Sequence, residues 1–416
     1  MKTAAVIAEY NPFHSGHGYH IEKTKKETGA DYVLVVMSGH FVQRGAPALL
    51  DKYTRTRAAL LGGADAVIEL PALYATSSAE YFAQGAVTLL HKLGVVDFLS
   101  FGSEEGATSP FIETAAALLS CGDSIRNTIQ ELLKEGLSYP AAQEKAAAKH
   151  LPFIKDRPKL LTAPNNVLGL EYCKALLALD SKITPFTMKR KGQDFKNSSI
   201  PSAPETFASA TAIRNGAVSC FRQILPFIPR ESRELFSSAM ESGCFLTEDD
   251  LSLMLHHQLL THSQSGFSMY LDCTPDLSAK ICKNLPAYTG FSDFCSLLKS
   301  KDLTYARISR TLLHILLEIR PPAFYQEPYS QREYHIPYGH LLGFRKSAGE
   351  LLSAIKKKSS IPLITKMADA KNTLTGQDLD FFNRELFCAS LYEAACRAKN
   401  KETALNELKQ SPVIVG

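Results

Sequence analysis

The feature that most constrains this chain is the alternation of short apolar runs with helical patterns over its first 190 residues. The apolar runs have strand length and lie at Thr3–Ala8, 31–37, Ala66–Leu70, 95–101 and 182–188, with helical patterns at 16–28, 53–61 and 79–92. The run at 31–37 is apolar throughout, which is typical of a strand covered on both faces. Such alternation favours right-handed crossovers and a parallel sheet between helices. We therefore expect an α/β fold with a Rossmann-like open parallel sheet.

This fold predicts where a ligand binds. In open parallel sheets, ligands lie beyond the carboxyl ends of the strands. Functional positions are therefore expected just after Ala8, Met37, Leu70, Phe101 and Met188.

The character of the sequence changes after Asn215. Residues 216–416 consist mostly of amphipathic helical patterns with few strand signals, which predicts a mainly α-helical C-terminal domain after an N-terminal domain of residues 1–215. Residues 108–150 are helical and rich in alanine, and we interpret them as an insertion or cap beside the sheet. Residues 192–204 are polar and rich in serine and proline, which predicts a loop.

Composition excludes several classes of protein. No apolar run approaches the length of a membrane helix, and Glu9 and Asn11 interrupt the apolar N-terminus, so we expect a buried strand and a cytoplasmic protein. The 9 cysteines form no metal-ligand spacing, and we expect free thiols, mostly buried, and no tightly bound metal. A net charge of +4 neither requires nor excludes a nucleic-acid partner.

The turn after the first strand carries the clearest chemical signal. It reads Asn-Pro-Phe-His-Ser-Gly-His from Asn11 and opens directly into a helix. A helix start directs unpaired N–H groups at one spot, which suits a phosphate, and Gly16 allows close approach. His14 and His17 lie three residues apart, so both imidazoles can donate to one phosphoryl group. The alternatives are two surface histidines at a helix start, or a metal pair without its third ligand.

A second anion-binding pattern occurs at Ser209-Ala-Thr-Ala-Ile-Arg214. Hydroxyl side chains at a helix start, with an arginine one turn later, suit an anion. Thr211 and Arg214 are therefore candidate phosphate ligands, although Ser209 alone can be an ordinary helix cap. Together with the histidine loop, this pattern resembles the two phosphate-binding motifs of the HIGH nucleotidyltransferase superfamily.

The resemblance is closer than the superfamily. Segments distributed over nearly the whole chain are similar to the tRNA(Met) cytidine acetate ligase family; they lie at 6–14, 37–48, 63–71, 101–104, 164–172, 189–190, 304–314 and 342–344. The resemblance implies an enzyme that uses ATP and acetate to form acetyl-adenylate. It then implies acetyl transfer to N4 of the wobble cytidine (position 34) of elongator tRNA(Met), with release of AMP and pyrophosphate.

The matched positions imply an ATP site with His14 and His17 as its catalytic residues. The implied ATP ligands are Ile7, Ala8, Glu9, Tyr10, Asn11, Pro12, Phe13, His14, Ser15, Gly16, His17, Gly18, Tyr19, His20, Gly102, Asn165 and Arg190. ATP is expected as a co-substrate with Mg²⁺. One departure is His40, where the family pattern has asparagine, so any substrate contact at that position is in doubt.

Other residues are candidates for the remaining substrates. Gln43 and Arg44, after the second strand, are candidates to position acetate or the cytosine, or else only to turn the chain. For the tRNA, the candidate phosphate contacts are Lys52, Arg55, Arg307 and Arg310, with solvated helix faces as the alternative. No membrane and no obligate protein partner are inferred.

Two other functions compete with the acetate ligase. One is a small-molecule nucleotidyltransferase, with adenylyl or cytidylyl transfer, and the long helical second half argues against it. The other is a non-catalytic RNA-binding protein, and the presence of all four residues His14, His17, Thr211 and Arg214 argues against it.

Overall fold

The structure, a computed structural model, describes residues 1–135, 137, 139–151, 157–190, 207–327, 329, 332, 334–400 and 406–416. The loop expected at 192–204 lies outside these residues. Within them, one sheet of eight strands forms the centre of the molecule, with the order β10-β8-β5-β2-β1-β6-β7 and β9 paired to β8. The strands are β1 Thr3–Ala8, β2 Tyr32–Ser38, β5 Ala66–Leu70, β6 Phe98–Ser103, β7 Thr184–Lys189, β8 Gly339–Arg345, β9 Leu363–Ile364 and β10 Val413–Val415. A separate pair, β3 Phe41–Val42 and β4 Ala46–Pro47, forms a small hairpin.

The first five large strands form the predicted parallel sheet. β5, β2, β1, β6 and β7 lie side by side and run in one direction. The order reverses at β1, which pairs β2 on one side and β6 on the other. This is the position at which such sheets bind ligands. The expected Rossmann-like fold is confirmed.

The helices cover both faces of the sheet. Their bounds are α1 Ser15–Thr28, α2 Lys52–Leu61, α3 Ala72–Ala75, α4 Ala79–Leu93, α5 Ser109–Lys134, α6 Tyr139–His150, α7 Pro164–Ala178, α8 Ala210–Cys220, α9 Arg233–Glu241, α10 Ser252–His262, α11 Pro275–Asn284, α12 Phe291–Leu298, α13 Tyr305–Leu316, α14 Gly349–Lys358 and α15 Gly376–Asn400. Among the described residues, no helix is both long and apolar enough to cross a membrane.

Side-chain alternation along the strands builds two cores. On one face, Ala5, Leu34 and Ile68 pack with α4 and α7. On the other face, Val35 and Val67 pack with α1 and α2. Because the central strand β2 is buried on both sides, its sequence is almost entirely apolar rather than alternating, whereas most residues of β7 at the edge of the sheet are half-buried or exposed. Each large aliphatic side chain buried here contributes roughly 1.5–3 kcal/mol.

The second half of the chain differs from the expectation of a separate helical domain. Its helices α10 to α13 form their own apolar core. However, β8, β9 and β10 join the N-terminal sheet, and β8 pairs with β5 in the antiparallel direction. The chain therefore returns to its first domain after residue 335, and a boundary at 215 does not separate two independent units.

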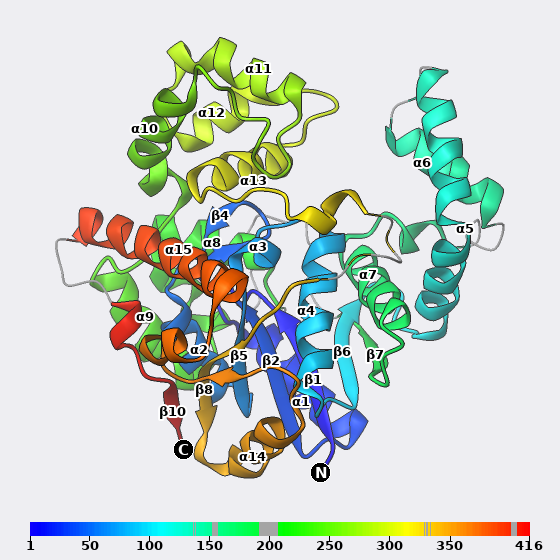
Figure 1. Cartoon of the computed structure of the whole chain (residues 1–416). Helices are drawn as coiled ribbons and strands as arrows, with labels where there is room; N and C mark the ends of the chain where they lie inside the picture. Colours follow the sequence, from blue (N-terminus) through cyan, green and yellow to red (C-terminus); the bar gives the residue numbers. More distant parts are fainter. Residues whose placement is uncertain are drawn as a thin grey trace.

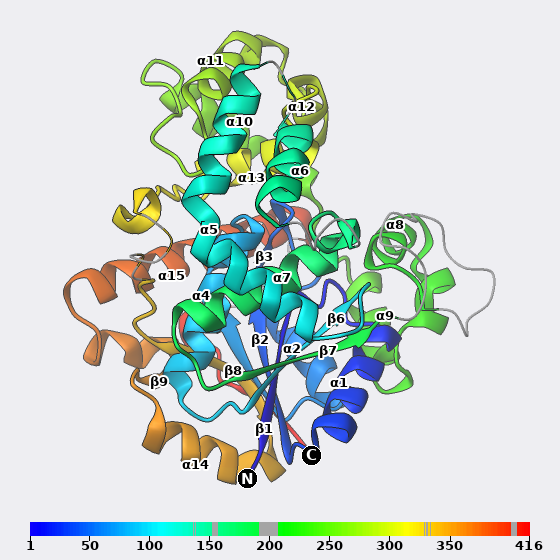
Figure 2. The same ribbon diagram turned by 90° about the vertical axis from the view of Figure 1, so that its right-hand side faces the viewer.

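The arrangement of the helices relative to the sheet defines the two ends of the molecule (Figure 1). The helices α10 to α13 stand beyond the carboxyl ends of the parallel strands, whereas α14 and both termini lie at the opposite end. Figure 2, turned by 90°, shows the same arrangement, with α10 to α13 at one end and α14 with both termini at the other. The helices α5 and α6, which correspond to the expected insertion, project from the body beside this upper end (Figure 1).

All nine cysteines are free thiols, as expected. The expectation that most are buried is wrong, since four are buried, four are half-buried and Cys220 is exposed.

Candidate active site

A cavity of about 510 Å³ lies at the carboxyl ends of β1 and β6. Its walls come from the turn after β1, the loop after β2, the starts of α4, α7 and α8, and the end of β7. Arg310 of α13 reaches the same cavity from the second half of the chain. A smaller cavity of about 90 Å³ shares His14, His17, His20 and Arg190 with it. The position matches the one predicted from the strand order.

Two stacked imidazoles lie at the first turn of α1. The rings of His14 and His17 are 3.6 Å apart between centroids. The Nδ1 atom of His14 accepts from Gly16 N at 3.1 Å, and Nδ1 of His17 accepts from His14 N at 3.2 Å. Because both Nδ1 atoms serve as acceptors, the proton of each neutral ring lies on Nε2. Each ring thus presents an Nε2–H donor.

The surroundings keep these imidazoles neutral. Burial, followed by the charges of Arg190 and Arg214, lowers the pKa of His14 to about 3. Burial and then His14 lower the pKa of His17 well below its usual value. Burial, with Arg190, also lowers the pKa of His20 to about 4. The three rings are therefore neutral at physiological pH, and Arg190 and Arg214 supply the positive charge.

One wall of the cavity is built on a hydrogen-bonded chain. Arg190 donates from NH1 to Asn165 Oδ1 at 3.2 Å, and Asn165 donates from Nδ2 to Glu104 Oε1 at 2.7 Å. These bonds fix which way the Asn165 amide points. Gly102 has the side-chain stem of Arg190 directly above it, which leaves little room for a Cβ atom. The three predicted residues Gly102, Asn165 and Arg190 are therefore adjacent. Glu104, which orients Asn165, was not predicted as a site residue.

The neighbouring Asn166 has a structural role. Its Oδ1 accepts from the backbone N–H groups of Glu104 and Glu105, and its Nδ2 donates to Lys159 O. The side chain is fully buried. It ties the loop after β6 to α7 rather than capping that helix. The first turn of α7 is capped by Glu104, whose Oε2 accepts from Asn166 N at 2.9 Å.

The start of α8, which was predicted to bind phosphate, forms another wall of the cavity. Ser209 caps the helix, with its Oγ accepting from Ala212 N at 3.0 Å. Arg214 lines the cavity and donates to Asn11 O at 2.9 Å and to Thr211 Oγ1 at 3.2 Å. Thr211 itself is not among the lining residues, so its hydroxyl orients Arg214. The two motifs predicted from sequence thus meet, because Arg214 joins the α8 start to the β1 turn.

The predicted ATP loop divides into lining and supporting residues. The residues of this loop that line the two cavities are Ile7, Ala8, Glu9, Tyr10, Asn11, His14, Gly16, His17, Tyr19 and His20. Phe13 is instead buried against Tyr10 at a ring distance of 4.9 Å. The Ser15 hydroxyl donates to Phe227 O. Pro12, Phe13, Ser15 and Gly18 are not among the lining residues and belong to the supporting structure.

Gln43, Arg44 and Arg310 line the far side of the cavity. The backbone N–H of Gln43 donates to Glu9 Oε1 at 2.9 Å, so the loop after β2 is attached to the loop after β1. Arg310 was predicted as a tRNA contact on a helix face, but it faces the catalytic cavity. Arg307 is half-buried at the start of α13 and does not line it.

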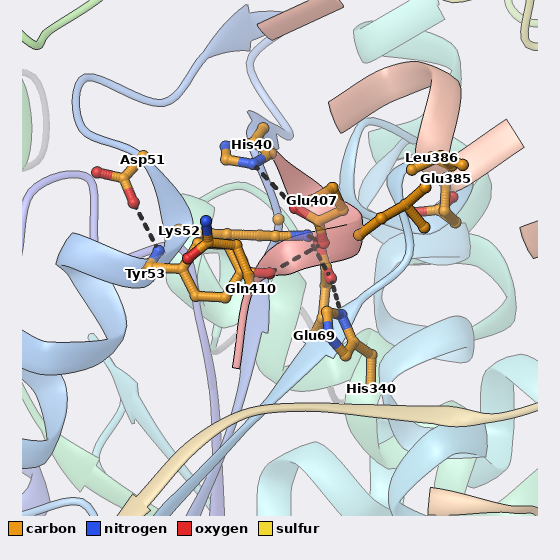
Figure 3. A network of polar contacts seen from close by, with 12 residues as sticks. His40, Asp51, Lys52, Tyr53, Glu69, His340, Glu385, Leu386, Glu407 and Gln410 are labelled. Atoms are coloured by element: carbon orange, nitrogen blue, oxygen red, sulfur yellow. Dashed lines mark hydrogen bonds and ion pairs between the residues drawn. The ribbon is translucent and has the colours of Figure 1, made fainter. Parts of the chain in front are cut away.

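The prediction that Lys52 and Arg55 contact tRNA is wrong, because both are buried, with exposed fractions of 2% and 1%. Lys52 Nζ lies 2.7 Å from Glu69 Oε2 and 2.6 Å from Glu407 Oε1 (Figure 3). Burial opposes the charge on Lys52, but the two carboxylates outweigh it and raise its pKa. Arg55 donates to the backbone carbonyls of Glu9, Ser38, Gly39 and Leu50. Both cations hold the framework together.

This buried cluster also contains a possible metal-ligand set. Glu69, His340 and Glu407 bring one ligand atom each within 4.8 Å of one another. The ammonium group of Lys52 already lies between the two carboxylates, where a cation would sit (Figure 3). His40, whose role was in doubt, stacks on Tyr392 at 4.3 Å and does not line the cavity. The cluster is therefore a structural ion pair that attaches the end of the chain to the sheet.

Comparisons with known proteins agree with this geometry. A family model described as HIGH Nucleotidyl Transferase matches residues 1–407. A protein of Thermoanaerobacter sp. (strain X514) named tRNA(Met) cytidine acetate ligase is 38% identical over 399 residues, covering 95% of this chain and 96% of its own. A protein of Clostridium novyi (strain NT) with the same name is 35% identical over 384 residues, covering 91% of this chain and 93% of its own.

Solved structures show the same fold. Apo TmcAL of Thermotoga maritima is 28% identical, with a TM-score of 0.91 and complete coverage of both chains. TmcAL of the same organism bound with alpha-thio ATP is 27% identical, with a TM-score of 0.87 and again complete coverage of both chains.

Proposed function

We propose that this chain, which belongs to the tRNA(Met) cytidine acetate ligase family of HIGH nucleotidyl transferases, activates acetate with ATP and acetylates N4 of the wobble cytidine of elongator tRNA(Met). The observation that carries the proposal is the pair of neutral imidazoles, His14 and His17. Their Nε2–H groups are free to donate because the backbone occupies both Nδ1 atoms. The site is therefore suited to an α-phosphate under nucleophilic attack.

In the first step, an acetate oxygen attacks the α-phosphorus, and the bond to the β-phosphate oxygen breaks. Acetyl-adenylate and pyrophosphate form. His14 and His17 stabilise the charge that grows on the α-phosphoryl oxygens. Arg214 and the N–H groups at the start of α8 are placed to hold the departing pyrophosphate. Among the described residues that line the cavity, Glu9 is the one carboxylate, so Mg²⁺ would arrive as the ATP complex and be held mainly by phosphates.

In the second step, the N4 amine of cytidine attacks the acyl carbon, and AMP leaves while N4 loses a proton. The helices α10 to α13 stand above the cavity, on the side from which an RNA base would approach (Figure 1). Arg307, at the start of α13, is a candidate phosphate contact there. The exposed lysines 356–358 of α14 lie at the opposite end of the molecule and are poorly placed for it. A tRNA substrate places the activity in the cytoplasm.

The test is to incubate the protein with ATP, labelled acetate and tRNA, and to digest the tRNA to nucleosides. Label in acetylcytidine, together with acetate-dependent exchange of pyrophosphate into ATP without tRNA, is the expected result. Transfer of AMP to a small acceptor instead would make the chain a small-molecule nucleotidyltransferase. The absence of any acetate-dependent turnover of ATP would refute the proposal.

A further inference from the structure

We propose that the part of the cavity between Gln43, Arg310 and the first turn of α4 is the acetate subsite, with Arg310 as the carboxylate ligand. The inference rests on the proposed function and names the residues that hold its second substrate. It also changes the role expected for Arg310, from a contact to tRNA on the surface to a contact to acetate in the cavity.

The guanidinium of Arg310 is held through its Nε atom, and its two terminal nitrogens are available to a ligand. Its Nε donates to Asp272 Oδ2 at 3.3 Å, and Tyr325 OH fixes Asp272 by donating to Oδ1 at 3.2 Å. The Arg310 side chain is 18% exposed. Its two terminal nitrogens have no hydrogen-bond partner within the described part of the chain, although the residue lines the cavity. A guanidinium in this state presents a fork of donors that matches a carboxylate.

Gln43 supplies a second, independent indication of a ligand. Its Nε2 is buried and without a partner among the described residues, and Gln43 lines the same cavity. A buried donor without an acceptor is unfavourable, because it has lost its hydrogen bonds to water and gained none in the protein. The backbone at Gln43 is fixed, because Gln43 N donates to Glu9 Oε1. The position of its side-chain amide beside the cavity is therefore set by the fold. An acceptor such as a carboxylate oxygen would satisfy it.

The contacts of α13 bring these groups together. Ser309 Oγ donates to Gly45 O at 2.8 Å, which places Arg310 against the loop that carries Gln43. The close approach uses Gly45 at φ 82°, because a Cβ there would meet the backbone of Arg310. One turn later on α13, His314 Nε2 lies 3.1 Å from Thr76 Oγ1, just before α4 begins.

The start of α4 completes the subsite. Tyr81 stacks on Tyr325 at 4.5 Å between ring centroids, so the first turn of α4 lies beside the Asp272–Arg310 pair. Ser78, the residue before the helix, makes no side-chain cap, and the first turn therefore keeps free N–H groups. Ala79 and Phe82 line the cavity from the same turn. The N–H groups of this turn can bind a carboxylate, and the neighbouring Ala79 and Phe82 can contact a methyl group. This combination suits acetate better than a phosphate.

This assignment makes the C-terminal half part of the first reaction. Arg310 lies on α13, whereas the imidazoles and Gln43 lie in the N-terminal domain. Acetyl-adenylate formation would then need both halves of the chain even without tRNA.

The test uses the full-length protein and measures the exchange of labelled pyrophosphate into ATP at varied acetate, without tRNA. Arg310→Ala should raise the KM for acetate about tenfold or more and leave the KM for ATP within about twofold. Arg310→Lys should show a smaller rise, because lysine lacks the fork. Gln43→Ala should raise the KM for acetate several-fold. Arg320→Ala, which removes an exposed arginine just after α13, is the matched control and should change neither constant.

The outcomes separate the two proposals. If the wild-type protein shows no acetate-dependent exchange, the proposed function fails. If it does, and Arg310→Ala and Gln43→Ala leave the KM for acetate unchanged, the acetate subsite is refuted. If the exchange reaction of Arg310→Ala is unchanged and only its KM for tRNA rises, measured separately as transfer of labelled acetate to tRNA, the subsite is likewise refuted and Arg310 is an RNA contact. Thermal unfolding verifies that each variant folds. If Arg310→Ala does not fold, the test relies on Arg310→Lys and Gln43→Ala.

Discussion

Replacing Lys52 with methionine should destabilise the protein strongly, because it removes a cation that two buried carboxylates share. Lys52 Nζ contacts both Glu69 oxygens, at 2.8 and 2.7 Å, and Glu407 Oε1 at 2.6 Å. Methionine fills the space but leaves two adjacent buried carboxylates without their partner. Breaking a buried ion pair in this way costs about 3–5 kcal/mol of unfolding free energy.

The pH dependence of this loss follows from the same groups. In the wild type, burial opposes ionisation of Glu69, but Lys52 and then His340 outweigh it and lower the pKa of Glu69. The stabilisation is therefore present above the carboxyl pKa of the unfolded chain and is lost as the pH falls through the folded value. Without Lys52 the carboxyls protonate more readily, so the penalty should be largest at pH 7 to 8 and smaller near pH 5.

Urea unfolding at pH 7.5 and pH 5 measures the effect. The matched control is Lys23→Met, because Lys23 pairs with Glu27 one turn later on α1 and both side chains are more than a third exposed. A surface pair of this kind contributes little to stability. If Lys52→Met costs no more than Lys23→Met, or if it weakens tRNA binding without changing stability, the reasoning about the buried cluster is refuted.

Three further predictions follow from the site and its surroundings. His17→Ala should reduce pyrophosphate exchange by roughly 10²–10³ while tRNA affinity in a filter-binding assay stays nearly unchanged; an equal loss of tRNA binding would contradict the role of the loop. Burial, followed by Glu69, raises the pKa of Glu385 to about 8, so wild-type stability should fall as the pH rises from about 4.5 to 8. Glu385→Gln should remove that slope and gain about 1–2 kcal/mol at pH 8 in urea unfolding, and an unchanged slope would contradict it. Arg307→Ala should weaken tRNA binding and reduce the slope of log K against log salt by about one, and an unchanged slope would remove it from the tRNA contacts.

The sequence predicted the parallel part of the sheet because its central strands β1, β2 and β5 are mostly apolar runs. The strand β1 was predicted with its observed bounds, and β6 begins three residues later than expected. The strand β8 was missed because its seven residues include two glycines and a histidine and resemble a loop. Its pairing with β5 depends on a contact between distant parts of the chain. No local pattern carries that information.

The candidate site shows the same division between local and distant contacts. The pairs His14 with His17 and Thr211 with Arg214 were found because their members are three residues apart, within one helical turn. Lys52 was misassigned because cations on one helix usually form a solvated face. Its partner Glu407 lies near the other end of the chain and cannot be seen from the helix sequence.

The most direct test of the central claim is the fate of labelled acetate. The purified protein, ATP and labelled acetate should produce labelled acetyl-adenylate without tRNA. Addition of elongator tRNA(Met) should move the label to one cytidine, with AMP and pyrophosphate formed in equal amounts. Label that never leaves the acetate pool, or an ATP turnover independent of acetate, would contradict the account.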